Sequence, residues 1–170
     1  DLGRADVVLA PTRHLLGLLA RSGVERGKLR LMPYAIEAKT LSGMPLPSFD
    51  ADHPVRFGFL GGLAKHKGAH VLLEAFRDVR GAELDVFGDS TDRPYVERVR
   101  ALCAKVGARW HGSFDRRELR AILARLDVVC VPSLWDENAP FVIREAFAAG
   151  RPVIASRSEA LLESVRDGVD

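Results

Sequence analysis

From Val55 onward, short apolar runs alternate with longer segments of helical periodicity, and this alternation constrains the fold more than any other feature. Strand-like runs occur at Val55–Leu60, Glu83–Phe87, Ala108–His111, Asp127–Val131 and Pro152–Ala155. Helical periodicity fills the intervals at Gly68–Val79, Arg93–Val106, Arg116–Arg125 and Phe141–Ala149. In the first interval the predicted buried stripe is Leu72, Ala75, Phe76 and Val79. Apolar strands that alternate with helices are typical of a parallel sheet covered on both faces, so the sequence predicts an α/β fold.

The first third of the chain has a different organisation. Strands are predicted at Ala5–Ala10 and at Lys28–Met32, with a helix between them that Thr12 caps. From Pro33 to Pro54, prolines and a glycine recur with little periodicity, which indicates a linker. Because the chain begins within a strand-to-helix unit and stops just after a helical segment, we expect it to be part of a larger protein.

Composition and charge argue against several classes of function. Hydrophobic residues make up 47% of the chain and charged residues 28%, as in a soluble globular domain. The net charge is only +2 and basic residues are interleaved with acidic ones, which gives no support for a nucleic-acid groove. No apolar run approaches the ~20 residues that cross a bilayer. The five histidines and two cysteines show no metal-ligand spacing, so no metal site is predicted. Unpaired Cys103 and Cys130 are expected to be buried thiols of a cytoplasmic protein.

An acidic pair follows the fourth predicted strand. Seven residues separate Glu137 from Glu145, across the junction between a loop and a helix. Ligand crevices in open α/β sheets lie at the carboxyl ends of strands, so this placement points to a ligand. Glu145 falls on a packed helix face, where either ligand hydroxyls or an arginine from elsewhere would satisfy its carboxylate. For Asp136 and Asn138, helix capping is as good an explanation as a role in binding a ligand, with Pro140 near the first helical position.

The first predicted strand of the regular region leads into a loop rich in glycine and lysine, Gly58-Phe59-Leu60-Gly61-Gly62-Leu63-Ala64-Lys65-His66-Lys67-Gly68. Glycines after a strand allow the backbone to approach a ligand closely, and the start of a following helix favours anions. Lys65, His66 and Lys67 are therefore mismatched with a helix start, and an anionic ligand such as a diphosphate would remove the mismatch. A solvated basic turn without a ligand is the alternative. The spacing matches neither a Walker A loop nor G-x-G-x-x-G, which argues against ATPase and nicotinamide functions.

Taken together, these segments resemble the family-4 retaining glycosyltransferases. The resemblance rests on Gly61-Gly62-Leu63 through Lys67-Gly68, on Pro132-Ser133, on Glu137-x7-Glu145-Ala146 and on Gly150-x-Pro152-Val153-Ile154-Ala155-Ser156. It implies the GT-B architecture, in which two Rossmann-like domains with parallel sheets enclose a cleft. Residues 1–36 would be the trailing strand–helix–strand of the N-terminal domain, 37–54 the interdomain linker, and 55–170 a truncated C-terminal domain that binds a nucleotide sugar.

The resemblance also implies an activity. The enzyme would move a hexosyl unit from a nucleotide-diphosphate sugar to an acceptor such as a glycan or glycolipid. It would work in the cytoplasm or at the inner membrane face, with peripheral membrane contact through the N-terminal part. We expect the present chain alone to bind nucleotide without transferring sugar.

Individual residues receive roles from the same resemblance. Lys67 would contact the donor diphosphate and stabilise its charge as it leaves, and Glu137 would face the hydroxyls of the donor sugar; these are the two implied catalytic residues. Glu145 would accept hydrogen bonds from the ribose hydroxyls of the nucleotide. The implied donor site is completed by Gly61, Gly62, Asn138, Ala139, Pro140 and Phe141. Neither a cofactor nor a metal is implied, because catalysis would come from positioning and charge stabilisation.

The sequence departs from the family pattern in ways that keep a second function open. Gly62 stands where the family usually carries an arginine, the second cation on the diphosphate. The other departures are Asn138-Ala139-Pro140 in place of a Phe-Gly pair, Arg157-Ser158-Glu159 in place of a glycine-rich loop, and Gly88-Asp89-Ser90 without a second glycine. A non-catalytic Rossmann-like module that binds a nucleotide or a partner protein is therefore the alternative, beside another enzyme of nucleotide sugars such as an epimerase.

The remaining candidates are interpreted as structural. His111 follows a predicted strand and is expected to pack there, and Trp110 and Trp135 are expected to fill the core or its rim. The arginines of the segment Arg116–Arg125 are interpreted as a solvated helix face.

Overall fold

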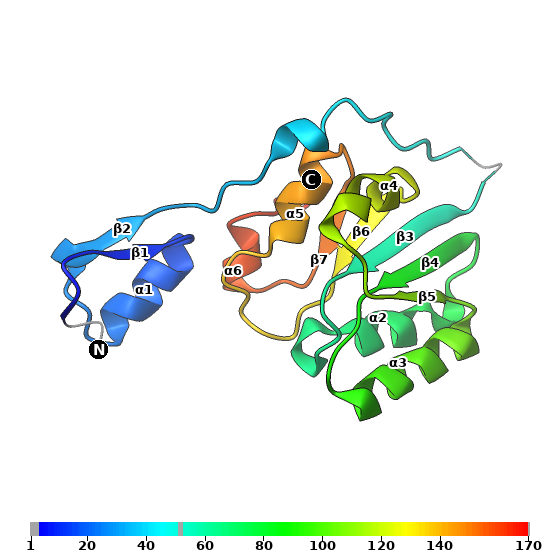
Figure 1. Cartoon of the computed structure of the whole chain (residues 1–170), viewed down its shortest axis with the longest axis horizontal. Coiled ribbons are helices and arrows are strands. Elements are labelled where there is room, and N and C mark those ends of the chain that lie inside the picture. Colours follow the sequence, from blue (N-terminus) through cyan, green and yellow to red (C-terminus); the bar gives the residue numbers. More distant parts are fainter. Residues whose placement is uncertain (1–3, 51–52, 170) are drawn as a thin grey trace.

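The computed structural model describes residues 4–50 and 53–169, which form a smaller and a larger unit joined by an extended segment (Figure 1). In the smaller unit, β1 (Val8–Ala10) and β2 (Leu29–Leu31) pair in parallel and α1 (Arg13–Arg21) connects them. The helix begins as predicted, because the Thr12 hydroxyl accepts a hydrogen bond from the backbone N–H of Leu15. Within the described ranges no helix combines the length and the apolar character needed to cross a membrane.

The larger unit is built on a parallel sheet. Among the described residues its strands are β3 (Val55–Leu60), β4 (Ala82–Phe87), β5 (Arg109–Gly112), β6 (Val128–Val131) and β7 (Val153–Ala155). Their spatial order is β5-β4-β3-β6-β7, and all neighbours are parallel. The chain builds the sheet outward from β3 in one direction and then from β6 in the other, so the strand order reverses between these two strands. The predicted parallel sheet is confirmed, and each strand of this unit ends within one residue of its prediction.

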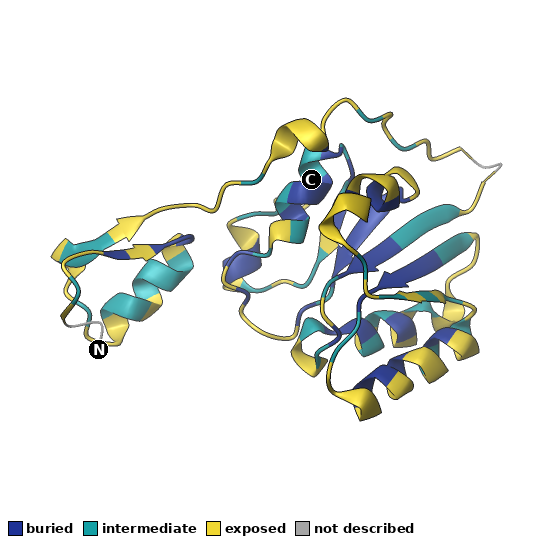
Figure 2. Cartoon of the chain, in the orientation of Figure 1, coloured by how far each residue is buried: buried dark blue, intermediate teal, exposed yellow. Residues whose placement is uncertain are grey.

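Helices cover both faces of this sheet (Figure 1). They are α2 (Ala69–Ala75), α3 (Arg93–Val106), α4 (Leu119–Ala124), α5 (Phe141–Ala148) and α6 (Glu159–Leu162). Neighbouring strand residues serve opposite faces: Phe59 packs with buried residues of α2 and α3, whereas Leu60 packs with those of α4, α5 and α6. Two apolar cores result, one on each side of the sheet, and Figure 2 shows the burial concentrated along the strands and the inward sides of the helices.

The start of α2 corrects one prediction. Gly68 adopts the left-handed conformation, with φ at +74°, so the helix begins only at Ala69, and it tightens into a 3₁₀ turn at Phe76. The inward face of this segment consists of Ala69, Leu72, Leu73 and Phe76. Ala75 and Val79 of the predicted stripe are exposed: Ala75 lies on the outward side of the helix, and Val79 follows the 3₁₀ turn that ends this segment. The predicted stripe is therefore confirmed for Leu72 and Phe76 and wrong for Ala75 and Val79.

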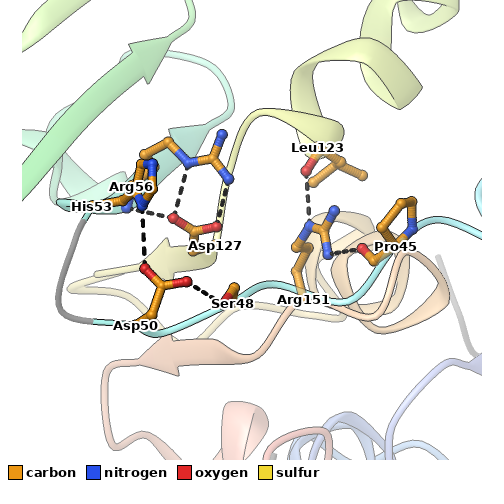
Figure 3. Close-up of polar contacts among 8 residues, drawn as sticks. All are labelled: Pro45, Ser48, Asp50, His53, Arg56, Leu123, Asp127 and Arg151. Carbon is orange, nitrogen blue, oxygen red and sulfur yellow. Dashed lines mark hydrogen bonds and ion pairs between the residues drawn. The ribbon is translucent and has the colours of Figure 1, made fainter.

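The segment between β2 and β3 packs against the larger unit. The Arg151 side chain is buried and donates from Nε to the carbonyl of Leu123 at 2.9 Å and from Nη1 to the carbonyl of Pro45 at 2.8 Å (Figure 3). Leu41 is 3% exposed and belongs to the core that contains α4 and α5. A segment whose sequence looks like a linker is thus fastened to the sheet unit by a buried arginine and a buried leucine.

Candidate functional site

A cavity of about 400 Å³ opens where the strand order reverses. Its wall is made by the ends of β3 and β6, by the loops that follow them and by α5. Every residue of the predicted donor site lines it: Gly61, Gly62, Lys67, Glu137, Asn138, Ala139, Pro140, Phe141 and Glu145. Two loops that are far apart in the sequence therefore converge on one cavity.

The two loops touch each other through their backbones. A Cβ atom on Gly68 would lie 1.9 Å from the carbonyl oxygen of Pro132, so only glycine permits this approach. The backbone N–H of Leu134 donates to the carbonyl of His66 at 2.7 Å. These contacts fix the lysine-bearing loop after β3 against the glutamate-bearing loop after β6, and they set the distance between their side chains.

Lys67 and Glu137 meet at this junction. The Lys67 ammonium donates to both carboxylate oxygens of Glu137, at 2.7 and 2.8 Å, and the Ser133 hydroxyl donates to Oε1 at 2.7 Å. The Glu137 side chain is 10% exposed, so its charge depends on these partners for stabilisation. The structure brings together the two residues that the sequence implies for catalysis and adds Ser133, which the sequence analysis quoted only as part of a motif.

Glu145 has an arginine partner, the second of the two explanations that its sequence position allowed. Its side chain is 7% exposed, and the Arg116 guanidinium donates from Nη1 to Oε1 at 2.7 Å. Arg116 opens the 3₁₀ turn Arg116–Glu118 that precedes α4, in a segment interpreted from sequence as a solvated helix face. That interpretation is wrong for Arg116: its side chain is two-thirds exposed, but its tip reaches back to α5.

Tyr34 closes one side of the cavity and was not identified from the sequence as a site residue. Its ring stacks on Phe141, with centroids 5.1 Å apart and planes at 14°, and its hydroxyl lies 3.3 Å from Nδ2 of Asn138. Arg144 donates to its backbone carbonyl. The aromatic ring therefore joins the segment after β2 to the first turn of α5, and a tyrosine beside a predicted linker was the only sequence signal for it.

Two local predictions around the cavity are wrong. Pro140, in extended conformation, occupies the N-cap of α5, and no side chain caps that helix, so capping does not explain Asp136 or Asn138. Lys65, His66 and Lys67 form a separate 3₁₀ turn, because left-handed Gly68 interrupts the chain before α2. The three cations therefore lie in a separate turn before α2 and not in its first helical turn. The predicted mismatch between these cations and the helix dipole does not arise.

The structure also places the residues interpreted as structural. His111 stacks on Phe87, with centroids 4.3 Å apart, and its Nε2 lies 2.5 Å from a carboxylate oxygen of buried Asp85. Burial alone would raise the pKa of Asp85, but hydrogen bonds from Arg109 and His111 outweigh it and hold that pKa below its usual value. Among residues 4–50 and 53–169, no group of three histidine, cysteine or acidic side chains is placed to hold a metal ion.

The indole rings and the thiols differ in how deeply they are buried. Trp110 donates from Nε1 to the carbonyl of Gly88, which fits a packing role, whereas Trp135 is 64% exposed on the loop after β6. Cys103 and Cys130 are buried free thiols, as predicted. Burial raises the pKa of the Cys130 thiol, which also lines the cavity, to about 12.

Solved structures with the same fold include a protein in complex with UDP-glucose and a sucrose-phosphate synthase. Anabaena HepE in complex with UDP-glucose matches with a TM-score of 0.84 at 20% identity, over 98% of this chain and 49% of that one. Sucrose-phosphate synthase from Thermosynechococcus elongatus matches with a TM-score of 0.77 at 26% identity, over 94% and 43%. These likenesses confirm the predicted α/β fold with its parallel sheet between helices, as found in GT-B proteins.

Sequence relatives point to one family. The chain is 31% identical over 122 residues to a glycogen synthase of Mycobacterium tuberculosis, covering 68% of this chain and 29% of the relative. It is 34% identical over 118 residues to the lipopolysaccharide core biosynthesis glycosyltransferase LpsE of Rhizobium meliloti, covering 69% and 34%. The chain therefore spans about a third of the length of these curated relatives. A family model described as "Glycosyl transferases group 1" matches residues 54–170. The chain belongs to the group 1 glycosyl transferases.

Proposed function

We propose that this chain forms the donor site of a retaining glycosyltransferase of family 4, which moves a hexosyl unit from a nucleotide-diphosphate sugar to a glycan or glycolipid. The observation that carries the proposal is the cavity at the reversal of strand order, where one lysine and two buried carboxylates converge. Such a cavity offers a cation for a diphosphate and acceptors for sugar hydroxyls. The reaction would take place in the cytoplasm, at the inner membrane face where the acceptor is a glycolipid.

The names of related proteins support the classes of donor and acceptor. HepE binds UDP-glucose, and LpsE acts in lipopolysaccharide core biosynthesis. A nucleoside diphosphate and a hexose fit the polar groups of the cavity, because its described lining offers the Lys67 ammonium as a donor and the carboxylates of Glu137 and Glu145 as acceptors. No cofactor or metal forms part of the proposal.

In the proposed mechanism, Lys67 stabilises the charge that develops on the diphosphate as the glycosidic bond breaks. Lys67 is hydrogen-bonded to Glu137 in the structure. A diphosphate that binds the ammonium would break these hydrogen bonds and leave the carboxylate able to bind the hydroxyls of the sugar. No side chain caps the first turn of α5, and its backbone N–H groups, beside Phe141, add partial positive charge at the same edge of the cavity. Glu145 accepts from the ribose hydroxyls on the other side.

The absence of a second cation at Gly62 is the main departure within this proposal. Lys65 is exposed two residues before Lys67, and its side chain has no hydrogen-bond or ion-pair partner in the described part of the chain. It is therefore free to turn toward a diphosphate at the mouth of the cavity, at a cost of about 1–2 kcal/mol in rotamer entropy.

Calorimetric titration of the intact protein with UDP, GDP and ADP tests the proposal. We expect one diphosphate to bind selectively and both Lys67→Ala and Glu145→Gln to weaken it at least about tenfold, since each removes a charged hydrogen-bond partner. Lys105→Ala, which alters an exposed lysine of α3, is the matched control and should bind as the unchanged protein does. If none of the diphosphates binds, the proposal of a glycosyltransferase donor site is contradicted, and the alternative of a non-catalytic module that binds a partner protein is favoured.

A further inference from the structure

We propose that Arg116 is a positioning residue for the donor: it holds one carboxylate oxygen of Glu145 so that the other faces the ribose hydroxyls. This inference rests on the proposed function and assigns to it a residue outside the motifs that define the site. Arg116 is not among the described residues that line the donor cavity; it lines a neighbouring cavity with Arg117 and Arg120. Its effect on the donor therefore passes through Glu145.

The two oxygens of Glu145 have different surroundings. Oε1 accepts from Nη1 of Arg116 at 2.7 Å, whereas no described residue hydrogen-bonds to Oε2. Glu145 lies between fully buried Ile143 and Ala146 on α5, and it lines the donor cavity. An oxygen with unused acceptor capacity on a buried carboxylate is suited to a hydroxyl pair of a ligand, because ribose offers two adjacent donors.

The backbone that carries Arg116 is fixed on both sides. Asp115 accepts from the backbone N–H of Arg117 at 2.8 Å, and Glu118 accepts from the backbone N–H of Asp115 at 2.7 Å, which together form a capping box. Leu119, 4% exposed, then anchors the turn in the core. The guanidinium therefore extends from an ordered turn and can define where the Glu145 carboxylate lies.

Arg117 offers a matched control in the same turn. It is exposed, and the contact recorded for it is made by its backbone N–H, so replacing its side chain keeps the capping box. Arg116→Met and Arg117→Met each remove one exposed positive charge from adjacent positions. They differ only in the hydrogen bond to Glu145, and any effect of net charge on an anionic ligand appears in both.

The experiment compares each nucleoside diphosphate that binds the intact protein with its 2′,3′-dideoxy analogue, by calorimetry. The unchanged protein should prefer the ribose form by at least about tenfold, because the analogue leaves Glu145 without its hydroxyl partners. Arg117→Met should keep that ratio, Arg116→Met should reduce it to about threefold or less, and Arg116→Lys should restore part of it. Lys67→Ala should weaken both ligands equally and leave the ratio unchanged.

The outcomes separate the two proposals. Equal ratios in Arg116→Met and Arg117→Met, with nucleotide binding intact, overturn the role of Arg116 and leave the donor site standing. Failure of the unchanged protein to bind any diphosphate overturns the donor site, and the role of Arg116 with it. A loss of affinity in Arg116→Met that is equal for both ligands also contradicts the inference, because a general disturbance of the fold would act in that way.

Discussion

Lys67 and Glu137 are 70 residues apart in the sequence, yet the lysine ammonium lies 2.7 and 2.8 Å from the two carboxylate oxygens. The pair spans the point where the strand order of the sheet reverses, with one partner after β3 and the other after β6. Its existence means that the main cation of the proposed donor site is already compensated by an internal anion. A diphosphate must compete with Glu137 for Lys67, so the pair sets both the affinity for the donor and the freedom of the glutamate.

Glu137→Gln should therefore separate binding from transfer. The neutral amide holds Lys67 less tightly and removes a negative charge from the cavity, so the affinity for a nucleoside diphosphate should rise by about threefold or more. Sugar transfer should fall at least about tenfold, because an amide contacts the donor hydroxyls less strongly than a carboxylate. Calorimetry and a transfer assay on the intact protein measure the two effects. The control is Glu97→Gln, which alters an exposed glutamate of α3. A parallel loss of affinity and transfer would contradict the competition.

Gly68→Ala should disrupt the junction between the two loops. The new Cβ atom would lie 1.9 Å from the Pro132 carbonyl oxygen and would also occupy a left-handed conformation, with φ at +74°. Gly81 has a similar φ of +68° but open space around it, so Gly81→Ala isolates the backbone strain, about 1–2 kcal/mol. Gly68→Ala should cost about 1–3 kcal/mol more, from overpacking. Urea unfolding measures both, and equal losses would show that the contact with Pro132 is unimportant.

The sequence predicted the sheet well, because apolar strands and helical periods are local patterns that packing then reinforces. The cavity residues were also predictable, since their motifs follow β3 and β6 directly and parallel strands bring their carboxyl ends to one edge. Arg116 and Tyr34 were not: Arg116 hydrogen-bonds to Glu145 and Tyr34 lines the cavity, and neither contact has a signal in the local sequence. The stripe on α2 was half right: Leu72 and Phe76 pack against the core, whereas Ala75 lies on the outward side of the helix and Val79 lies beyond its end.

Asp127 should make the stability of the larger unit depend on pH. Its carboxylate, 4% exposed, accepts from the side chain and the backbone N–H of Arg56 (Figure 3). Burial alone would raise its pKa, but these hydrogen bonds from Arg56 outweigh it, and the pKa lies below its ordinary value of 3.8. A depressed pKa means that the stabilisation is present above about pH 4 and is lost as the pH falls through the folded-state value.

The substitution Asp127→Asn tests that dependence. At pH 6 it should lower the free energy of unfolding by about 1–3 kcal/mol, less than for a fully buried pair because the Arg56 side chain is 43% exposed. The difference from the unchanged protein should shrink as the pH is lowered from 5 to about 3. Asp78→Asn, at an exposed aspartate without a recorded partner, should show no such convergence. Urea midpoints along a pH series measure this difference. A difference in stability that stays constant with pH would show that Asp127 does not contribute to the loss of stability in acid.

Arg151 should decide whether the segment between the two units stays on the sheet unit. Burial lowers the pKa of its guanidinium below the ordinary value, with the nearby Asp127 carboxylate opposing that effect. Its two hydrogen bonds end on the carbonyls of Leu123 and Pro45, and the Leu123 carbonyl also accepts from the backbone N–H of Leu126 at 3.2 Å. Arg151→Met therefore removes the arginine donor from the Pro45 carbonyl and should cost about 1–3 kcal/mol. The Pro45 side of the contact belongs to a surface segment, which should then detach more readily and be cleaved faster by a protease than in the unchanged protein.

Arg125→Met is the matched control, because Arg125 is an exposed arginine at the end of α4 with no hydrogen bond or ion pair recorded for its side chain. It removes the same charge and should leave both the free energy of unfolding and the cleavage rate unchanged. Limited proteolysis followed by mass spectrometry locates the cleavage sites. Cleavage of Arg151→Met throughout the sheet unit would indicate global unfolding, whereas cleavage confined to residues 42–50 would show that one buried arginine holds this segment in place. Since Tyr34 reaches the donor cavity from the same connection, local release should also weaken nucleotide binding while Arg125→Met preserves it.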